Sequence, residues 1–246
     1  MVPDYVMDPG RFQAAIDDGT RLIGDIVWPS SQALAENLAG QYDGGKGWLA
    51  SAFEGRRVLE LGCGLGLGGL TVASISRPAK VLLTDREPEV VALTSRSVEV
   101  NGYSATSRRG PRGTRLPAVS TRVLDWGVEA EWPKHDEFDC IVATDVLYHG
   151  GAERDHRALI SFLLHALSPT AEEAAVTDPG RRWLQRRFAV FVEPAHEERT
   201  TATDGPQFEL AARDAGLTVD VYKLPGARAM QLIKVVSNAG YAQVNQ

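Results

Sequence analysis

A run of glycines beside a carboxylate is the part of the sequence whose residue types point most directly to chemistry. Glu60, Gly62, Gly64 and Gly66 lie in the segment ELGCGLG, which follows an apolar stretch and precedes a stretch able to form a helix. Glycine permits a positive φ and a close approach of the backbone to a bound molecule. The segment therefore predicts a ligand-binding loop between a strand and a helix.

Two classes of ligand fit such a loop. A G-x-G-x-x-G pattern starts at Gly64, and in that pattern a helix N-terminus receives the diphosphate of a dinucleotide. However, Gly62 is the first glycine after the strand, and counting from it places Leu67 where the third glycine should be. A carboxylate at Glu60 would also repel a diphosphate, whereas S-adenosylmethionine carries a sulfonium and an ammonium group and no phosphate. These features favour S-adenosylmethionine as the ligand.

Two more candidates for the site follow apolar segments. Asp85 ends KVLLTD, where an acid can accept hydrogen bonds from both ribose hydroxyls of a nucleoside. The alternative role for Asp85 is to cap the helix that begins near Glu87. Trp126 ends TRVLDW, where an indole could lie against an adenine ring. Taken alone, Trp126 is more simply interpreted as part of the hydrophobic core.

These candidates need elements that bring several strand ends to one edge of a sheet. From Arg57 onward, strand-like and helix-like segments alternate, which predicts an α/β fold of the doubly wound, Rossmann-like type with helices on both faces. We expect a seven-stranded sheet, mostly parallel, that ends in an antiparallel C-terminal hairpin. The expected strands are 57–61, 79–85, 121–126, 137–148 and 188–194, with a hairpin of 217–224 and 229–236. One expected helix begins at residue 67, and three others span 87–101, 155–167 and 207–215.

The 246 residues are expected to form a single domain. Residues 1–50 precede the first strand and are predicted to form an N-terminal arm or lid. The polar segments 104–120 and 170–186 are predicted to be loop insertions, and their arginines are expected to be solvated.

Composition excludes several classes of protein. A net charge of -6 argues against broad binding to nucleic acid or to an anionic membrane. The two cysteines form no disulfide framework, and the sequence shows neither a signal peptide nor a long apolar run, so we expect a cytoplasmic protein, with the nucleus as an alternative. His196 and Glu197 begin an H-E-x-x-H pattern that Thr200 breaks, and no metal site is expected.

Five segments together carry a resemblance to a known family. They are Val27-Trp28-Pro29, VLELGCGLGLGGL, LLTD, VLDWG and FDCIVATDVLY. In this order they resemble the seven-strand methyltransferases of lysine methyltransferase family 16, the METTL21-like protein lysine methyltransferases. The resemblance spans about residues 25–236, and the Asp-x-x-Tyr of Asp145 and Tyr148 is the mark of this family.

The resemblance implies an enzyme that transfers methyl groups from S-adenosyl-L-methionine to a lysine of an intracellular protein. It implies that Asp145 and Tyr148 face the substrate. A chaperone or a translation factor is the implied kind of substrate, and the enzyme is expected to be a monomer. The residues implied to contact the cofactor, together with Glu60 from the charge argument, are Trp28, Gly62, Cys63, Gly64, Asp85, Trp126 and Thr144.

The chemistry of such a transfer assigns a role to Asp145. The lysine amine must first lose a proton, which costs about 4–5 kcal/mol at pH 7 because its pKa is near 10.4. Burial beside a sulfonium reduces that cost. A carboxylate at Asp145 works in the opposite direction. We therefore expect Asp145 to orient the amine and accept its hydrogen bond rather than to act as a strong base, and Tyr148 to offer its ring face or its hydroxyl.

Other interpretations remain open at this point. Asp145 could cap a helix, and Tyr148 could be interior packing. Histidine or a small amine is the nearest alternative acceptor. An NAD(P)-dependent oxidoreductase would need a relay such as Tyr-x-x-x-Lys, but Ala152 stands where the lysine should follow Tyr148. A binding module without catalytic activity is a third class.

Overall fold

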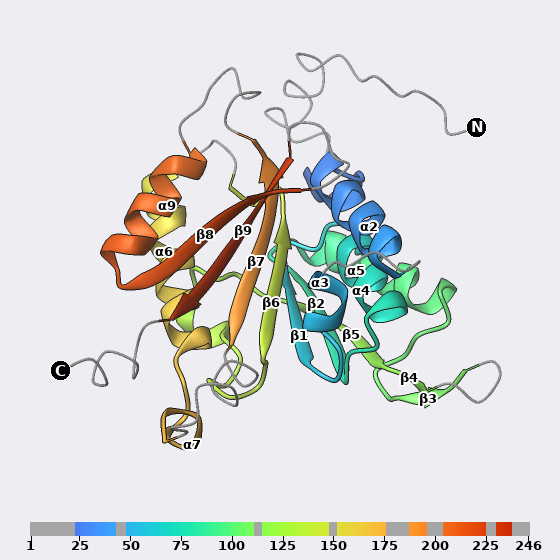
Figure 1. The fold of residues 1–246 in the computed structure, drawn as a ribbon. Helices are drawn as coiled ribbons and strands as arrows, with labels where there is room; N and C mark the ends of the chain where they lie inside the picture. The colour runs from blue at the N-terminus through green and yellow to red at the C-terminus, as the bar shows by residue number, and fades with distance from the viewer. Residues whose placement is uncertain are drawn as a thin grey trace, which may run out of the picture.

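A seven-stranded sheet forms the centre of the computed structural model (Figure 1). The structure describes residues 23–42, 48–110, 115–147, 152–175, 187–195, 204–224 and 230–237. Across the sheet the strand order is β5-β2-β1-β6-β7-β9-β8. The strands are β1 (Arg57–Leu61), β2 (Lys80–Asp85), β5 (Ala118–Val123), β6 (Cys140–Thr144), β7 (Phe188–Pro194), β8 (Leu217–Lys223) and β9 (Met230–Ser237).

Strand pairing confirms the predicted fold class. The five strands from β5 to β7 are parallel, and β9 pairs antiparallel with both β7 and β8. The chain builds outward from β1 in one direction through β2 and β5, and in the other through β6 and β7. The carboxyl ends of β1 and β6 therefore form the switch point at which doubly wound sheets bind ligands.

Helices cover both faces of this sheet (Figure 1). Alternate residues of each strand point to opposite faces, so Val58 packs in one buried cluster and Leu59 in the other. The first cluster joins the sheet to α2 (Pro29–Tyr42), α3 (Leu49–Ala52), α4 (Leu67–Ile75) and α5 (Pro88–Val100). The second joins it to α6 (Ala152–Leu167) and α9 (Asp204–Asp214).

The third strand of the sequence does not have its predicted bounds. β5 covers Ala118–Val123, whereas the prediction placed it at 121–126 and assigned 118–120 to an insertion. Its bounds follow from its pairing with all of β2, from Lys80 to Asp85. β5 is an edge strand and needs few apolar residues, so its polar sequence gave a weak signal. The rest of the insertion includes a short antiparallel pair, β3 (Arg108–Arg109) and β4 (Arg115–Leu116).

Two other segments have a definite place in the fold. Leu34 and Leu38 of α2 are fully buried, so this part of residues 1–50 packs against the sheet and α4. Part of the segment 170–186 forms α7 (Ala171–Ala174), whose first turn has a capping box between Thr170 and Glu173. Residues 1–22, 43–47 and 176–186 lie outside the described residues. Within the described residues, no helix is long and apolar enough to span a membrane.

Candidate cofactor and substrate site

The glycine loop between β1 and α4 has the backbone that its sequence predicts. Gly62, Gly64 and Gly66 all have positive φ, at 59°, 51° and 83°. A Cβ placed on Gly62 would lie only 2.8 Å from Cγ1 of Val146, so this position also requires the absence of a side chain. The loop thus brings bare backbone to the carboxyl end of β1, next to the segment that follows β6.

Asp85 holds the glycine loop from the neighbouring strand. Its Oδ2 accepts a hydrogen bond from the Gly64 N–H at 3.2 Å, and its Oδ1 accepts one from the Glu87 N–H at 3.2 Å. Burial raises the pKa of the Asp85 carboxyl, and these two backbone hydrogen bonds oppose that shift. A carboxylate has about four acceptor positions, so Asp85 can support the loop and still accept hydrogen bonds from a ligand.

Thr94 is a loop contact that the sequence analysis missed. This fully buried residue of α5 directs its hydroxyl at the carbonyl oxygens of Gly64 and Val90, and its Oγ1 lies 3.7 Å from Sγ of Cys63. Burial also raises the pKa of the Cys63 thiol well above its usual range, which disfavours the thiolate form that a nucleophile requires. Thr94 occupies one apolar stripe of an amphipathic helix, and nothing in its spacing indicates that it contacts the loop.

Glu60 lies beneath α4, with its side chain away from solvent. It is only 1% exposed, and its Oε1 accepts a hydrogen bond from the Gly69 N–H at 3.1 Å. Burial, with a smaller contribution from the charge of Asp85, raises the pKa of Glu60 to about 8. At neutral pH this carboxyl is therefore mostly uncharged. Asp85, rather than Glu60, is the acid that adjoins the loop, so the repulsion of a diphosphate expected from Glu60 is not supported by its surroundings.

Asp145 follows β6 in a backbone conformation that is uncommon for residues other than glycine. Its φ is 58°, in the left-handed region where Asp and Asn are the common exceptions to glycine. Its N–H donates to the Val192 carbonyl at 3.0 Å, which keeps it beside β7. Thr144, the last residue of β6, is almost fully buried. Tyr148 lies outside the described residues.

The segment before Trp28 lies against the glycine loop. A Cβ placed on Gly64 would be 3.3 Å from the Gly24 carbonyl oxygen, and one on Gly24 would be 2.8 Å from the Val90 side chain. Trp28 is half-buried, and its carbonyl accepts the first hydrogen bonds of α2. The segment just before the Val27-Trp28-Pro29 motif therefore lies against the predicted cofactor loop.

Trp126 is half-buried at the end of the segment that leaves β5. The Leu124 N–H donates to the Asp85 carbonyl at 2.9 Å, which brings this segment next to the end of β2. Trp126 packs against the second core cluster, and its carbonyl accepts a hydrogen bond from Trp132 Nε1 at 2.9 Å. Packing against the core and contact with a ligand are both compatible with this position.

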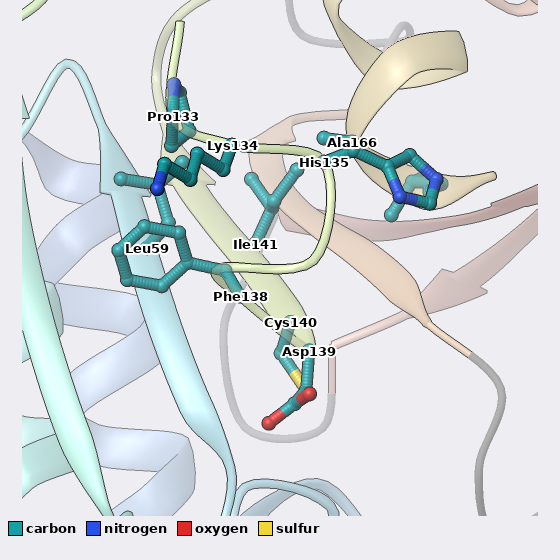
Figure 2. A pocket seen from close by; sticks show the side chains of 10 residues that line it. Leu59, Pro133, Lys134, His135, Phe138, Asp139, Cys140, Ile141 and Ala166 are labelled. Atoms are coloured by element: carbon teal, nitrogen blue, oxygen red, sulfur yellow. The ribbon is translucent and has the colours of Figure 1, made fainter. Parts of the chain in front are cut away.

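Figure 2 shows a pocket at the other end of β6. Its lining includes Phe138, Asp139 and Cys140, which lie at the start of the strand, whereas Asp145 follows its end. Asp139 forms an ion pair with Arg57 at 2.5 Å. This pocket is therefore separate from the edge where the predicted site residues gather. Among the described residues, no group of His, Cys, Asp and Glu side chains could hold a metal ion.

Comparisons with known proteins identify the family of this chain. The family model described as lysine methyltransferase matches residues 11–189. The chain is 31% identical to a calmodulin-lysine N-methyltransferase of Arabidopsis thaliana over 67% of its own length and 47% of the relative. It is 34% identical to the human protein-lysine N-methyltransferase EEF2KMT, over 76% of this chain and 57% of the relative. The chain spans about half the length of the curated relatives it matches.

A solved structure supports the fold independently. The magnesium protoporphyrin IX methyltransferase ChlM of Synechocystis PCC 6803, solved with bound SAM, superposes with a TM-score of 0.51. The match covers 95% of this chain and 94% of that one at 16% sequence identity. At that identity the likeness establishes a shared fold.

Proposed function

Since this chain belongs to the lysine methyltransferase family, we propose that it transfers the methyl group of S-adenosylmethionine to the side-chain amine of a lysine in another protein. One observation supports this proposal above the others. The glycine loop after β1, Asp85 at the end of β2 and Asp145 after β6 come together at the carboxyl edge of three adjacent strands. This arrangement supports a cofactor site that lies next to an acceptor site.

The described residues fit S-adenosylmethionine. The positive φ values of the glycine loop expose bare backbone, and the Asp85 carboxylate beside the loop has acceptor positions left for the ribose hydroxyls. We propose further contacts from Trp28, Cys63, Trp126 and Thr144, and a supporting role for Glu60 under α4. The cofactor supplies a methyl group already activated by its bond to a positively charged sulfur.

The residues of this chain would align and prepare the amine. Asp145 accepts a hydrogen bond from the incoming amine and fixes its direction, and we propose that Tyr148 contacts the same group. The amine must arrive without its proton, which is lost to water, because only a free lone pair can attack. Alignment of donor and acceptor can contribute several kcal/mol to such a reaction.

The proposed substrate is an intracellular protein, either a chaperone or a translation factor, and not a nucleic acid or a membrane. The names of the two relatives above support a protein acceptor. We propose that the enzyme is a monomer that acts in the cytoplasm, with the nucleus as an alternative. Both cysteines are buried and free, as is typical of a reducing compartment. Histidine or a small amine is the alternative acceptor.

Isothermal titration calorimetry separates this proposal from the oxidoreductase alternative. We expect S-adenosylhomocysteine to bind and NADH to give no heat. Tight binding of NADH without a response to S-adenosylhomocysteine would overturn the cofactor assignment.

Asp145→Asn tests the acceptor side. Asparagine tolerates the left-handed backbone, so this variant keeps the turn. It removes the charge and replaces one acceptor oxygen with an NH2 group, which cannot accept a hydrogen bond from the amine. We expect the rate of methyl transfer into lysate proteins to fall roughly 100-fold, with the affinity for S-adenosylhomocysteine unchanged. Transfer would be followed with a labelled donor, and mass spectrometry would identify the labelled residue. Wild-type turnover in Asp145→Asn would remove Asp145 from the mechanism.

A further inference from the structure

A buried carboxylate on β7 holds the segment that follows β6. Glu193 is only 2% exposed, and its Oε1 accepts hydrogen bonds from two consecutive backbone groups, the Val146 N–H at 2.9 Å and the Leu147 N–H at 3.3 Å. One side chain thus secures the two residues directly after Asp145.

Glu193 also explains how Asp145 keeps its unusual backbone. A non-glycine residue with positive φ is strained and persists only where its surroundings hold it. Here the Asp145 N–H is bound to the Val192 carbonyl on one side, and Glu193 binds the next two N–H groups on the other. Both anchors come from the end of β7, so that strand fixes the turn.

Val146, which Glu193 holds, also lies against the glycine loop. Glu193 accepts a hydrogen bond from the Val146 N–H. A Cβ placed on Gly62 would lie only 2.8 Å from Cγ1 of the same Val146. A shift of Val146 would therefore alter the spacing between the glycine loop and Asp145.

We propose that Glu193 is a positioning residue that sets Asp145 against the glycine loop, through its hydrogen bonds to Val146 and Leu147. The inference rests on the proposed function, because Asp145 is the residue assigned to the methyl acceptor. Glu193 itself need not touch the substrate.

Three variants at this position test the assignment. Glutamine keeps an oxygen that can accept from both N–H groups, whereas alanine removes it and aspartate is one methylene too short. We expect kcat to fall roughly 10- to 100-fold in Glu193→Ala and Glu193→Asp, and to be largely restored in Glu193→Gln. Affinity for S-adenosylhomocysteine should stay within about twofold of wild type in Glu193→Gln. Glu137→Gln, which alters an ion pair with Lys80, is the matched control and should leave kcat unchanged.

A double-mutant cycle distinguishes positioning from a general loss of stability. If Glu193 acts through Asp145, Glu193→Ala should have little further effect on kcat in the Asp145→Asn background. Additive losses would show that Glu193 only stabilises the fold and would overturn the proposal. An equal loss of kcat in Glu193→Gln and Glu193→Ala would also overturn the proposal.

Hydrogen exchange tests the geometry without reference to activity. The amides of Val146 and Leu147 should be protected in the wild type and in Glu193→Gln, and should exchange faster in Glu193→Ala. If the proteins show this exchange pattern but the wild type transfers no methyl group, the proposed function is refuted. The role of Glu193 in holding Val146 and Leu147 would still stand. Unchanged exchange in Glu193→Ala would refute the anchor, whatever the activity.

Discussion

Glu60 shows how strongly burial changes the properties of a single residue. One of its carboxyl oxygens accepts a hydrogen bond from Gly69, and the other has no hydrogen-bond partner in the described structure. Burial raises the pKa of Glu60 from 4.5 to about 8, so the carboxyl keeps its proton at neutral pH. Ionising it in the folded protein costs free energy that the unfolded chain does not pay.

The pH dependence of stability should reveal this cost. Between about pH 4.5 and 8 the folded protein holds a proton on Glu60 that the unfolded chain has lost, so stability decreases as pH rises. The expected contribution is roughly 1.4 kcal/mol per pH unit. Glu60→Gln mimics the protonated carboxyl, and its stability relative to wild type should increase over this range. Urea denaturation at several pH values measures the difference.

Exposed Glu54 offers a control for the loss of one carboxyl group. Glu54→Gln should follow the wild type at each pH. If the difference between Glu60→Gln and wild type stays constant from pH 5 to 8, then Glu60 is already ionised in the folded protein.

At the level of elements, the start of α4 depends on close packing against the sheet. A Cβ on Gly69 would lie 2.3 Å from Cδ2 of Leu83 and 2.6 Å from Oε2 of Glu60. A helix with larger residues here could not approach β1 and β2 so closely. Gly69 is therefore needed for packing, whereas Gly62 and Gly64 are needed for the turn.

Alanine at two helical glycines should have opposite effects. Gly69→Ala is expected to destabilise the protein by about 1–3 kcal/mol or more, because the added methyl overlaps Leu83 and Glu60. Gly40 in α2 has no atom within 4 Å of a built Cβ, so Gly40→Ala should stabilise by about 0.5–1 kcal/mol. Thermal or urea denaturation measures both. Equal effects of the two substitutions would contradict the packing described for α4.

Element boundaries were predictable where burial was complete and less so elsewhere. β1, β2 and β7 are mostly apolar and almost entirely buried, and the predicted ranges agree within a residue. β6 was predicted too long, at 137–148, because apolar residues continue past Thr144 after the sheet pairing ends. The end of β6 is set by the positive φ of Asp145, and local hydrophobicity does not encode that.

Across the whole molecule, stability should be highest in the centre of the sheet. Every residue of β6 is buried, and so is every residue of β7 except Pro194, because helices cover both faces. The edge strand β8 is buried only near its start, and Asp220–Lys223 are exposed.

Hydrogen exchange should follow this gradient. Amides of β6 and β7 should exchange only through global unfolding, and those of Asp220–Lys223 should exchange much earlier through local opening. Peptide-resolved exchange under native conditions measures both. Protection of Asp220–Lys223 equal to that of β6 would indicate that another part of the chain or a partner covers β8.

The amino-acid sequence was enough to predict the fold class, the glycine loop, the position of Asp85 at the end of a strand and the likeness to lysine methyltransferases. These properties depend on neighbouring residues, on hydrophobic periodicity and on motif spacing, all of which are local. The three-dimensional arrangement was needed to show that Glu60 is buried with a raised pKa, that Thr94 supports the loop and that Glu193 holds the segment after Asp145. Each of these depends on residues from different elements meeting across the sheet, and burial and hydrogen bonding between such residues leave no pattern along the chain.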